Sequence, residues 1–326
     1  MTKRFWAETL LEIRDWLVVT LDRAGGGRVD FEVPDPALGP GLYGGEEVQV
    51  GGRIALHRGY RCWVELAELL GCRLLIPQHG TAAPGDGFAR LRFERLADEG
   101  SFHDADGAPA DPTEKYGAAS PFARIDKLEE PSFLWALEAA LVRVNLAPGA
   151  RVLDLGVNTG DELELLRRVV GQPRFDGLDL VGVDHSVTAI ARASERFPGA
   201  GHRMLVHDIN ALGALNLGRF DLLLSVGTLQ SPGIHNNKQL VGRLVQDHLT
   251  PTGAVILGFP NCRWQGGEAR YGARPPNYNH PELSVVLKDV DWCKRYLQQH
   301  RYRVTVTGRH YLFVTATRIG VGADEP

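Results

Sequence analysis

The sequence is poor in cysteine, methionine and lysine, and it has no long apolar run. Its 326 residues include only 4 Cys, at positions 62, 72, 262 and 293, and these form no Cys-x-x-Cys pair. We therefore expect neither a disulfide framework nor a metal site, and reduced thiols are typical of a cytoplasmic protein. No stretch reaches the roughly 20 apolar residues that span a bilayer. The first residues lack the apolar core of a signal peptide.

Basic and acidic residues nearly balance. The formal charge is -4 and the isoelectric point about 6.3, which excludes a globally basic nucleic-acid coat but leaves a local basic patch open. Only 6 of the 36 basic residues are lysines, so 30 are arginines. The apolar fraction of 44% is typical of a globular protein, and the length indicates two domains or one enlarged domain.

The first 115 residues predict a small α+β domain. Helical spacing runs from about residue 5 to 20, YRCWVELAELLG predicts a second helix, and CRLLIP and FARLRFERL predict strands. EEVQVGGRIALH predicts a hairpin with two candidate registers. A two-residue turn pairs Val50 with Arg53, whereas a three-residue loop pairs Val50 with Ile54. We favour the second because it keeps one face apolar. A polar, Gly/Pro-rich stretch places the domain boundary near residue 115.

From residue 150 onward, short apolar runs alternate with helical patterns. RVLDLG, LDLVGVD, HRMLVHDI, FDLLLSVG and AVILGF are separated by segments of helical periodicity. This alternation predicts strand–helix–strand units with a parallel sheet that is buried on both faces. Right-handed crossovers then give a doubly wound architecture.

The strongest chemical signal is VLDLGVNTGDE at residues 152–162. Gly156 and Gly160 allow a tight loop and a close approach of the backbone to a ligand, at the start of a helix that favours an anionic or polar group. Asp184 ends the next predicted strand, where a carboxylate can accept two ribose hydroxyls, or can cap a helix over 186–197. Asp208 follows the third strand, where it can accept an adenine amine or stabilise a turn.

Residues 116–326 resemble a class I S-adenosylmethionine-dependent methyltransferase. VLDLGVNTG is similar to the first motif of that family, VGVDHS to the second, HDI to the third and FDLLLSVGTLQ to the fourth, and RVTVTGRHYLFVTATR resembles its closing antiparallel hairpin. The resemblance implies a seven-stranded sheet with six parallel strands and one antiparallel strand. The family usually has Gly where this chain has Asn158, but Asn tolerates left-handed backbone, so the turn is expected to survive.

The resemblance also implies the cofactor S-adenosylmethionine and the residues that hold it. These are Asp154, Gly156, Asn158, Gly160, Asp184, His185, Asp208, Ile209, Ser225 and Arg124. SPFARIDKLEEPSFLWALEAALVRV is expected to form a helix on the sheet. Tyr116, Phe122 and Arg124 are expected to form a lid, with Arg124 reaching the cofactor carboxylate.

The segment 259–286 follows the fifth strand and is long for a loop, which favours a role in substrate binding. The predicted substrate residues are Gln230, Asn261, Trp264, Tyr271 and Arg274. His280 or His235 is the candidate base that removes a proton from the substrate, and Tyr278 is a further catalytic candidate.

The favoured function is methyl transfer to a small polar or aromatic metabolite. A tRNA or other RNA methyltransferase is the alternative, supported by seven arginines of the first domain: Arg53, Arg58, Arg61, Arg73, Arg90, Arg92 and Arg95. A non-catalytic partner protein with this fold is a third hypothesis, for which Asn158 is the sequence feature. The sequence leaves open whether the protein is a monomer or a homodimer.

Overall fold

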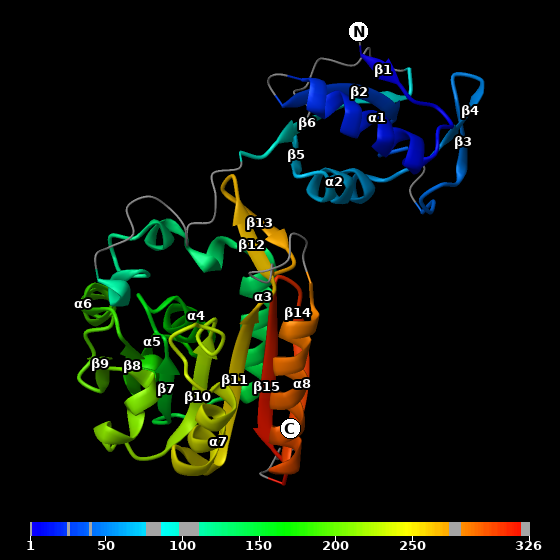
Figure 1. Cartoon of the computed structure of the whole chain (residues 1–326). Helices are drawn as coiled ribbons and strands as arrows, with labels where there is room; N and C mark the ends of the chain where they lie inside the picture. Colours follow the sequence, from blue (N-terminus) through cyan, green and yellow to red (C-terminus); the bar gives the residue numbers. More distant parts are fainter. Residues whose placement is uncertain are drawn as a thin grey trace. The chain divides into compact units, whose positions relative to one another are not determined.

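The chain forms two compact units, Met1–Glu99 and Gly100–Pro326, in the computed structural model (Figure 1). The structure describes residues 2–24, 27–38, 41–75, 86–97, 111–273 and 282–320. Within these ranges, no helix has the length and apolar character that a bilayer crossing requires. The accessory role expected for residues 1–115 stays a prediction.

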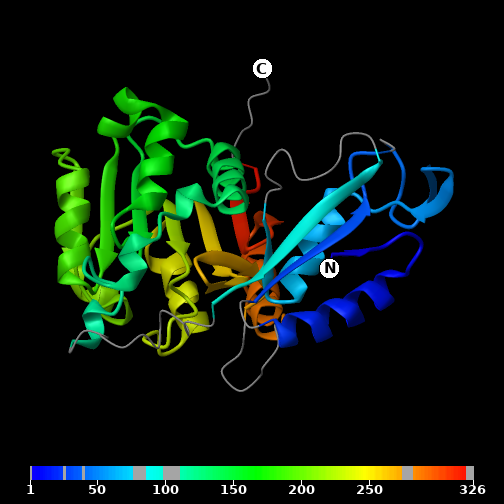
Figure 2. The ribbon, with the colours of Figure 1, turned by 90° about the horizontal axis from the view of Figure 1, so that it is seen from above.

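The first unit is a four-stranded sheet with two helices on one face. Its strand order is β1-β2-β6-β5, and β2 and β6 are the long strands in Figure 2. The elements are β1 (Lys3–Arg4), α1 (Leu10–Arg23), β2 (Arg28–Pro34), β3 (Glu47–Val50), β4 (Arg53–Leu56), α2 (Tyr60–Leu69), β5 (Cys72–Leu75) and β6 (Phe88–Arg95). Leu17 of α1, Trp63 of α2 and Phe31 of β2 share one buried cluster, so both helices cover the same face.

The predicted helix over 5–20 in fact begins at Leu10. Thr9 and Glu12 form a capping box that fixes this start, and Phe5 belongs to the extended segment before it. This Thr-x-x-Glu signal is present in the sequence and could have corrected the prediction. The helix over YRCWVELAELLG and the strand alternation in FARLRFERL are confirmed.

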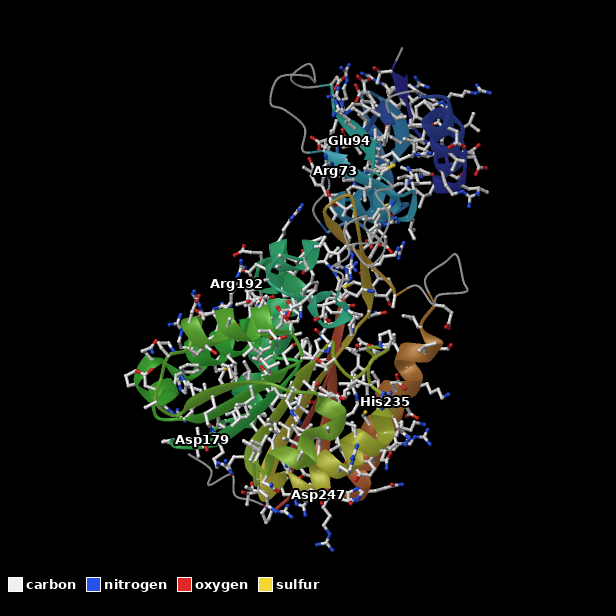
Figure 3. The ribbon with its side chains drawn as sticks, turned by 60° about the vertical axis from the view of Figure 1, so that its left-hand side comes forward. Arg73, Glu94, Asp179, Arg192, His235 and Asp247 are labelled. Carbon is white, nitrogen blue, oxygen red and sulfur yellow. The ribbon has the colours of Figure 1, made fainter. Side chains whose placement is uncertain are left out.

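The other face of this sheet carries arginines that lie opposite acids. The register places Arg28 opposite Glu94, Asp30 opposite Arg92, and Glu32 opposite Arg90. Arg92 Nε lies 2.5 Å from Asp30 Oδ1. Arg73 Nη2 lies 2.6 Å from Glu94 Oε2 (Figure 3). Opposite charges in direct register stabilise a sheet modestly, so these arginines have a structural role in the fold.

The β3–β4 hairpin adopts the register that we did not favour. Val50 pairs with Arg53 and Val48 with Ala55, across a two-residue turn of Gly51 and Gly52. Both glycines have positive φ, 54° and 77°, as the two-residue hairpin turn with matching twist requires. Turn geometry therefore outweighed the fully apolar face that the three-residue loop offered.

The second unit contains a seven-stranded sheet of order β14-β15-β11-β10-β7-β8-β9, in which six strands share one direction and β15 runs opposite to them. The predicted doubly wound sheet is confirmed. The strands are β7 (Arg151–Leu155), β8 (Asp179–Asp184), β9 (His202–Val206), β10 (Phe220–Val226), β11 (Leu249–Pro260), β14 (Tyr302–Gly308) and β15 (Tyr311–Arg318).

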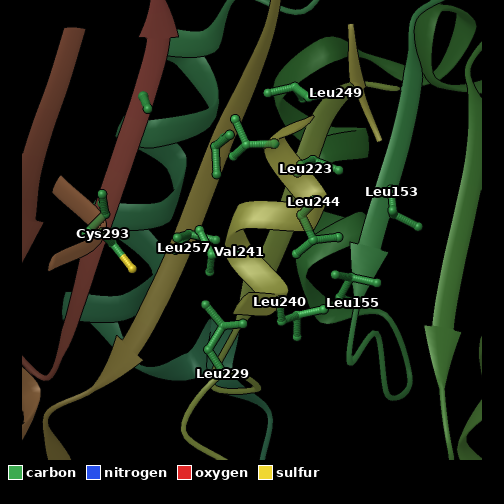
Figure 4. Packing of buried hydrophobic residues seen from close by; sticks show 14 of the residues in the cluster. Leu153, Leu155, Leu223, Leu229, Leu240, Val241, Leu244, Leu249, Leu257 and Cys293 are labelled. Atoms are coloured by element: carbon green, nitrogen blue, oxygen red, sulfur yellow. The ribbon is translucent and has the colours of Figure 1, made fainter. Parts of the chain in front are cut away.

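Helices cover both faces of this sheet. They are α3 (Pro131–Val144), α4 (Asp161–Val170), α5 (Gln172–Asp176), α6 (Val187–Arg196), α7 (Asn237–Asp247) and α8 (Ser284–Gln299). Alternate residues of β7 point to opposite layers: Val152 belongs to the buried cluster that contains α3 and α4 residues, and Leu153 to the one that contains α7 and α8 residues (Figure 4). Burial on both faces explains the near-continuous apolar strands.

Two segments differ from the sequence prediction. The helix expected over 120–144 begins only at Pro131, and the residues before it form the short 3-10 helices η2 (Pro121–Arg124) and η3 (Lys127–Glu129). Proline fits the first turn of a helix but not its interior, which explains this start. The expected loop 259–286 contains a hairpin of β12 (Cys262–Gln265) and β13 (Glu268–Tyr271), joined by a second Gly-Gly turn with positive φ.

The packing of α3 gives a stability prediction. Leu137 is fully buried in the layer between α3 and the sheet, whereas Val142 on the same helix is 61% exposed. Leu137→Ala should lower the free energy of unfolding of the second unit by about 2–5 kcal/mol, because it leaves a cavity. Val142→Ala should change it by less than about 0.5 kcal/mol. Hydrogen exchange of β7 and α3 peptides measures both, and equal effects would contradict the packing described.

Candidate functional site

The loop after β7 is shaped by positions that only glycine can occupy. Gly156 and Gly160 have φ values of 77° and 87°. A Cβ on Gly156 would collide with the side chain of Thr228, and one on Gly160 would collide with the Phe197 ring. Thr228, which follows β10, and Phe197, which follows α6, therefore pack directly against the loop. The loop leads into the N-terminus of α4 at Asp161.

Asn158 adopts the left-handed conformation that its place in the motif requires, with φ of 46°. Its backbone N–H donates to Asp184 Oδ2 at 3.0 Å, and its side-chain amide donates to the Tyr116 carbonyl at 2.7 Å. The expected survival of the turn is confirmed. The side-chain amide fastens the segment before η2 to the motif loop.

Asp184 ends β8 beside this loop. Its Oδ1 accepts the Ser186 N–H at 2.9 Å, and Ser186 itself is the N-cap of α6. The alternative role of Asp184 as the helix cap is therefore wrong. The carboxylate lies between the motif loop and the start of α6, and 8% of the residue is exposed.

Glu114 at the end of η1 (Pro112–Glu114) completes this corner, and no sequence signal pointed to it. One carboxylate oxygen accepts the Val187 N–H at 2.7 Å, and the other accepts the Ser186 hydroxyl at 3.0 Å and the Thr188 hydroxyl. The hydrogen bond from the Thr188 hydroxyl is the largest cause of a lowered pKa of Glu114. Burial acts in the opposite direction and raises that pKa, but the hydrogen bonds outweigh it. The segment 114–118 is thereby tied to α6 as well as to Asn158.

Asp154 lies inside the sheet at the end of β7, and only 1% of it is exposed. Its Oδ2 atom has no hydrogen-bond partner among the described residues. Burial, followed by the neighbouring Glu162, raises the pKa of Asp154 well above its ordinary value, while Lys127 lowers it. A buried carboxyl oxygen without a donor is costly, so this atom is suited to receive a donor from a ligand.

The other predicted cofactor residues lie along the same edge or at the surface. Asp208 is exposed and caps η4 (Ile209–Leu215) by accepting the Asn210 N–H at 2.9 Å, which is the turn role that the sequence also allowed. Ile209 is buried, and the Ser225 hydroxyl donates to the Leu155 carbonyl. His185 and Arg124 are exposed. The cofactor roles of all these residues stay predictions.

The predicted substrate residues divide into structural and accessible ones. Asn261 is buried, and its amide donates to the Arg309 carbonyl at 2.9 Å, so it fastens the base of the β12–β13 hairpin to the β14–β15 turn. Gln230 and Trp264 are half-buried, and Tyr271 is exposed. Arg274, Tyr278 and His280 lie outside the described residues.

Of the two candidate bases, His235 is the one that the structure describes. It is exposed in the loop between β10 and α7, and its backbone N–H donates to Asn210 Oδ1 at 3.2 Å (Figure 3). This bond brings the His235 loop beside the turn that Asp208 caps. A catalytic role for its imidazole stays a prediction.

Comparison with known proteins shows which family part of the second unit resembles. Residues 153–257, from β7 to β11, match the family model of a methyltransferase domain. Residues 153–257 are therefore similar to a methyltransferase domain, and the sheet that contains them has the strand arrangement expected of a class I S-adenosylmethionine-dependent methyltransferase. The match includes the motif loop, Asp184 and the strand that ends at Val226, which confirms the resemblance deduced from the motifs.

Curated relatives match the same part of this methyltransferase domain. A trans-aconitate 2-methyltransferase from Variovorax paradoxus (strain S110) is 36% identical over 123 residues, which are 38% of this chain and 43% of the relative. The enzyme of the same name from Paracidovorax citrulli (strain AAC00-1) is 33% identical over 38% of this chain and 44% of its own length. The chain thus spans less than half the length of these relatives.

Among solved structures, a similar one is a SAM-dependent methyltransferase from Aquifex aeolicus. The match has a TM-score of 0.41 at 19% identity, and it covers 60% of this chain and 98% of that one.

The residues of the methyltransferase domain fit its cofactor. S-adenosylmethionine carries an α-ammonium group, and the unpartnered Asp154 Oδ2 is a buried acceptor of the matching charge. Asp184 supplies a carboxylate at the end of the adjacent strand, where such sheets bind ribose hydroxyls. Gly156 and Gly160 keep the intervening loop free of side chains, so the backbone can approach the ligand.

Replacing Asp184 tests its place in the cofactor site. Asp184→Ala should weaken binding of S-adenosylhomocysteine by about 1–3 kcal/mol, because the ribose loses a charged acceptor. Asp247→Ala, at the exposed end of α7, removes the same charge and should leave affinity unchanged. Isothermal titration calorimetry measures both, and wild-type affinity in Asp184→Ala would remove Asp184 from the site.

Proposed function

We propose that the protein transfers a methyl group from S-adenosylmethionine to a small molecule. The observation that carries this proposal is Asp154, a buried carboxyl group that lacks a donor at the end of the strand that opens the methyltransferase match. The cofactor supplies a methyl group on a sulfonium, which is already an activated leaving group. The residues of the chain then need chiefly to hold the cofactor and align the acceptor.

The β12–β13 hairpin is the proposed cover of the acceptor. It follows β11 directly, and parallel sheets of this kind bind ligands at the carboxyl ends of their strands. Trp264 and Tyr271 lie on one face of the hairpin, where they can stack on a planar or apolar acceptor, and Arg263 and Arg270 lie opposite each other on the other face. Asn261 holds its base in place.

The class of the acceptor is also a proposal. The curated relatives are named for a small molecule, trans-aconitate, which favours a small metabolite over a macromolecule. The arginines that suggested RNA are largely engaged: Arg90 pairs with Glu32, Arg92 with Asp30 and Arg95 with Asp22. Asn158, the feature behind a non-catalytic partner, keeps the motif loop intact.

Deleting the hairpin separates substrate binding from cofactor binding. A variant in which residues 263–280 are replaced by a short Gly-Ser linker should lose methyl transfer by about 100-fold or more, because the acceptor is no longer aligned. Its affinity for S-adenosylhomocysteine should change little.

The assay follows transfer of a labelled methyl group to a panel of small carboxylic and aromatic acids. A matched control deletes residues 321–326 at the end of the chain, which should leave turnover intact. If the hairpin deletion still methylates the acceptor, the hairpin is not its cover. If no member of the panel accepts the methyl group while total RNA does, the small-molecule proposal is wrong.

A further inference from the structure

Two oppositely charged side chains, Lys127 and Glu162, lie behind the motif loop, and neither has a role in the proposed chemistry. Lys127 of η3 points its Nζ atom at Glu162 of α4, 3.6 Å from Oε1. The two side chains are 14% and 4% exposed. The ammonium also lies 5.4 Å from the Phe122 ring centroid and 6.0 Å from that of Tyr311. Lys127 is thus held between an acid and aromatic faces.

Lys127 and Glu162 form a buried cluster with Asp154, which contains two carboxyl groups and one ammonium group. Glu162 has Lys127 as its ion-pair partner, whereas Asp154 Oδ2 has no hydrogen-bond partner among the described residues. Three groups from three elements face Asp154: Glu162, Lys127 and Asp184. Lys127 in turn faces Asp161 and Tyr311. A buried acid without a counter-ion tends to stay protonated, and a protonated Asp154 could not attract an ammonium group.

Lys127 opposes this tendency at both acids. Burial raises the pKa of Glu162, and Lys127 lowers it. Burial and then Glu162 raise the pKa of Asp154, and Lys127 again lowers it. Burial alone would lower the pKa of Lys127, but Glu162 and Tyr311 raise it above its ordinary value, so the ammonium stays charged.

We infer that Lys127 is a positioning residue of the cofactor site, which neutralises Glu162 and so leaves the Asp154 carboxylate to receive the ammonium group of the cofactor. The inference rests on the proposed function, because it concerns how the cofactor is bound. This role differs from the one expected for Arg124, which was to bind the carboxylate group of the cofactor. Lys127 acts through Glu162 and is not required to touch the cofactor.

A double substitution tests this assignment in the full chain, with S-adenosylhomocysteine as the probe. Lys127→Met should weaken binding by about tenfold or more at pH 7, because two buried acids then share no counter-ion. Lys127→Met with Glu162→Met removes the acid together with its partner. This double variant should bind within about threefold of the wild type. Asp179→Asn, at the amino end of β8, is the control for loss of one charge and should bind as the wild type does.

The pH dependence of probe binding separates the two roles, because a purely structural role of Lys127 would not shift it. Below pH 7, where the α-amino group of the probe stays protonated, wild-type affinity should rise with pH as Asp154 ionises. In Lys127→Met this rise should move to higher pH, because the lysine no longer lowers the pKa of Asp154. In the double variant it should return toward the wild-type profile, because Glu162, which raises that pKa, is also absent.

The other possible results contradict either the inference about Lys127 or the proposed function. If the double variant binds as weakly as Lys127→Met, Lys127 contacts the cofactor itself and the inference is wrong. Unchanged affinity in Lys127→Met would also overturn the inference. Should Lys127→Met fail to fold, the double variant alone decides, since it removes Glu162 together with its counter-ion. Failure of the folded wild type to bind the probe would instead overturn the proposed function.

Discussion

The site depends on one constraint, which is that β7, β8, β10 and β11 run parallel and are buried on both faces. Every polar group that a strand carries must then emerge at its end, and parallel strands bring these ends to a single edge. Asp154, Asp184 and Ser225 reach that edge from three strands. The apolar layers of α3 and α4 on one side, and of α7 and α8 on the other, hold the strands in register.

The loop at this edge has room only for glycine at two positions. Thr228 lies where a side chain on Gly156 would be, and Phe197 lies where one on Gly160 would be. Asn158 then ties the loop to Asp184 on one side and to Tyr116 on the other. Glu114 fixes the same incoming segment to α6. The motif loop, the second strand end and the segment 114–118 therefore form one hydrogen-bonded corner.

The sequence predicted the parts of the molecule whose signals are local and periodic. Strand–helix alternation identified the five strands β7 to β11, the family resemblance supplied the closing strands β14 and β15, and the motif glycines located the loop. The register at Gly51-Gly52 was misjudged because the apolar pattern was given more weight than the positive φ that the pair supplies. The turn at Gly266-Gly267 was missed because the segment 259–286 was predicted as a loop. Lys127 and Glu114 could not be predicted, since each acts on a partner far along the chain: Glu162 and the start of α6.

Hydrogen exchange with and without S-adenosylhomocysteine tests most directly whether the cofactor binds at this edge. The structure predicts that the ligand slows exchange at the amides of residues 155–161 and 184–188, which form the motif loop and the start of α6, and leaves those of β2 and β6 unchanged. No protection of these segments at saturating ligand, or protection confined to the first unit, would contradict the account.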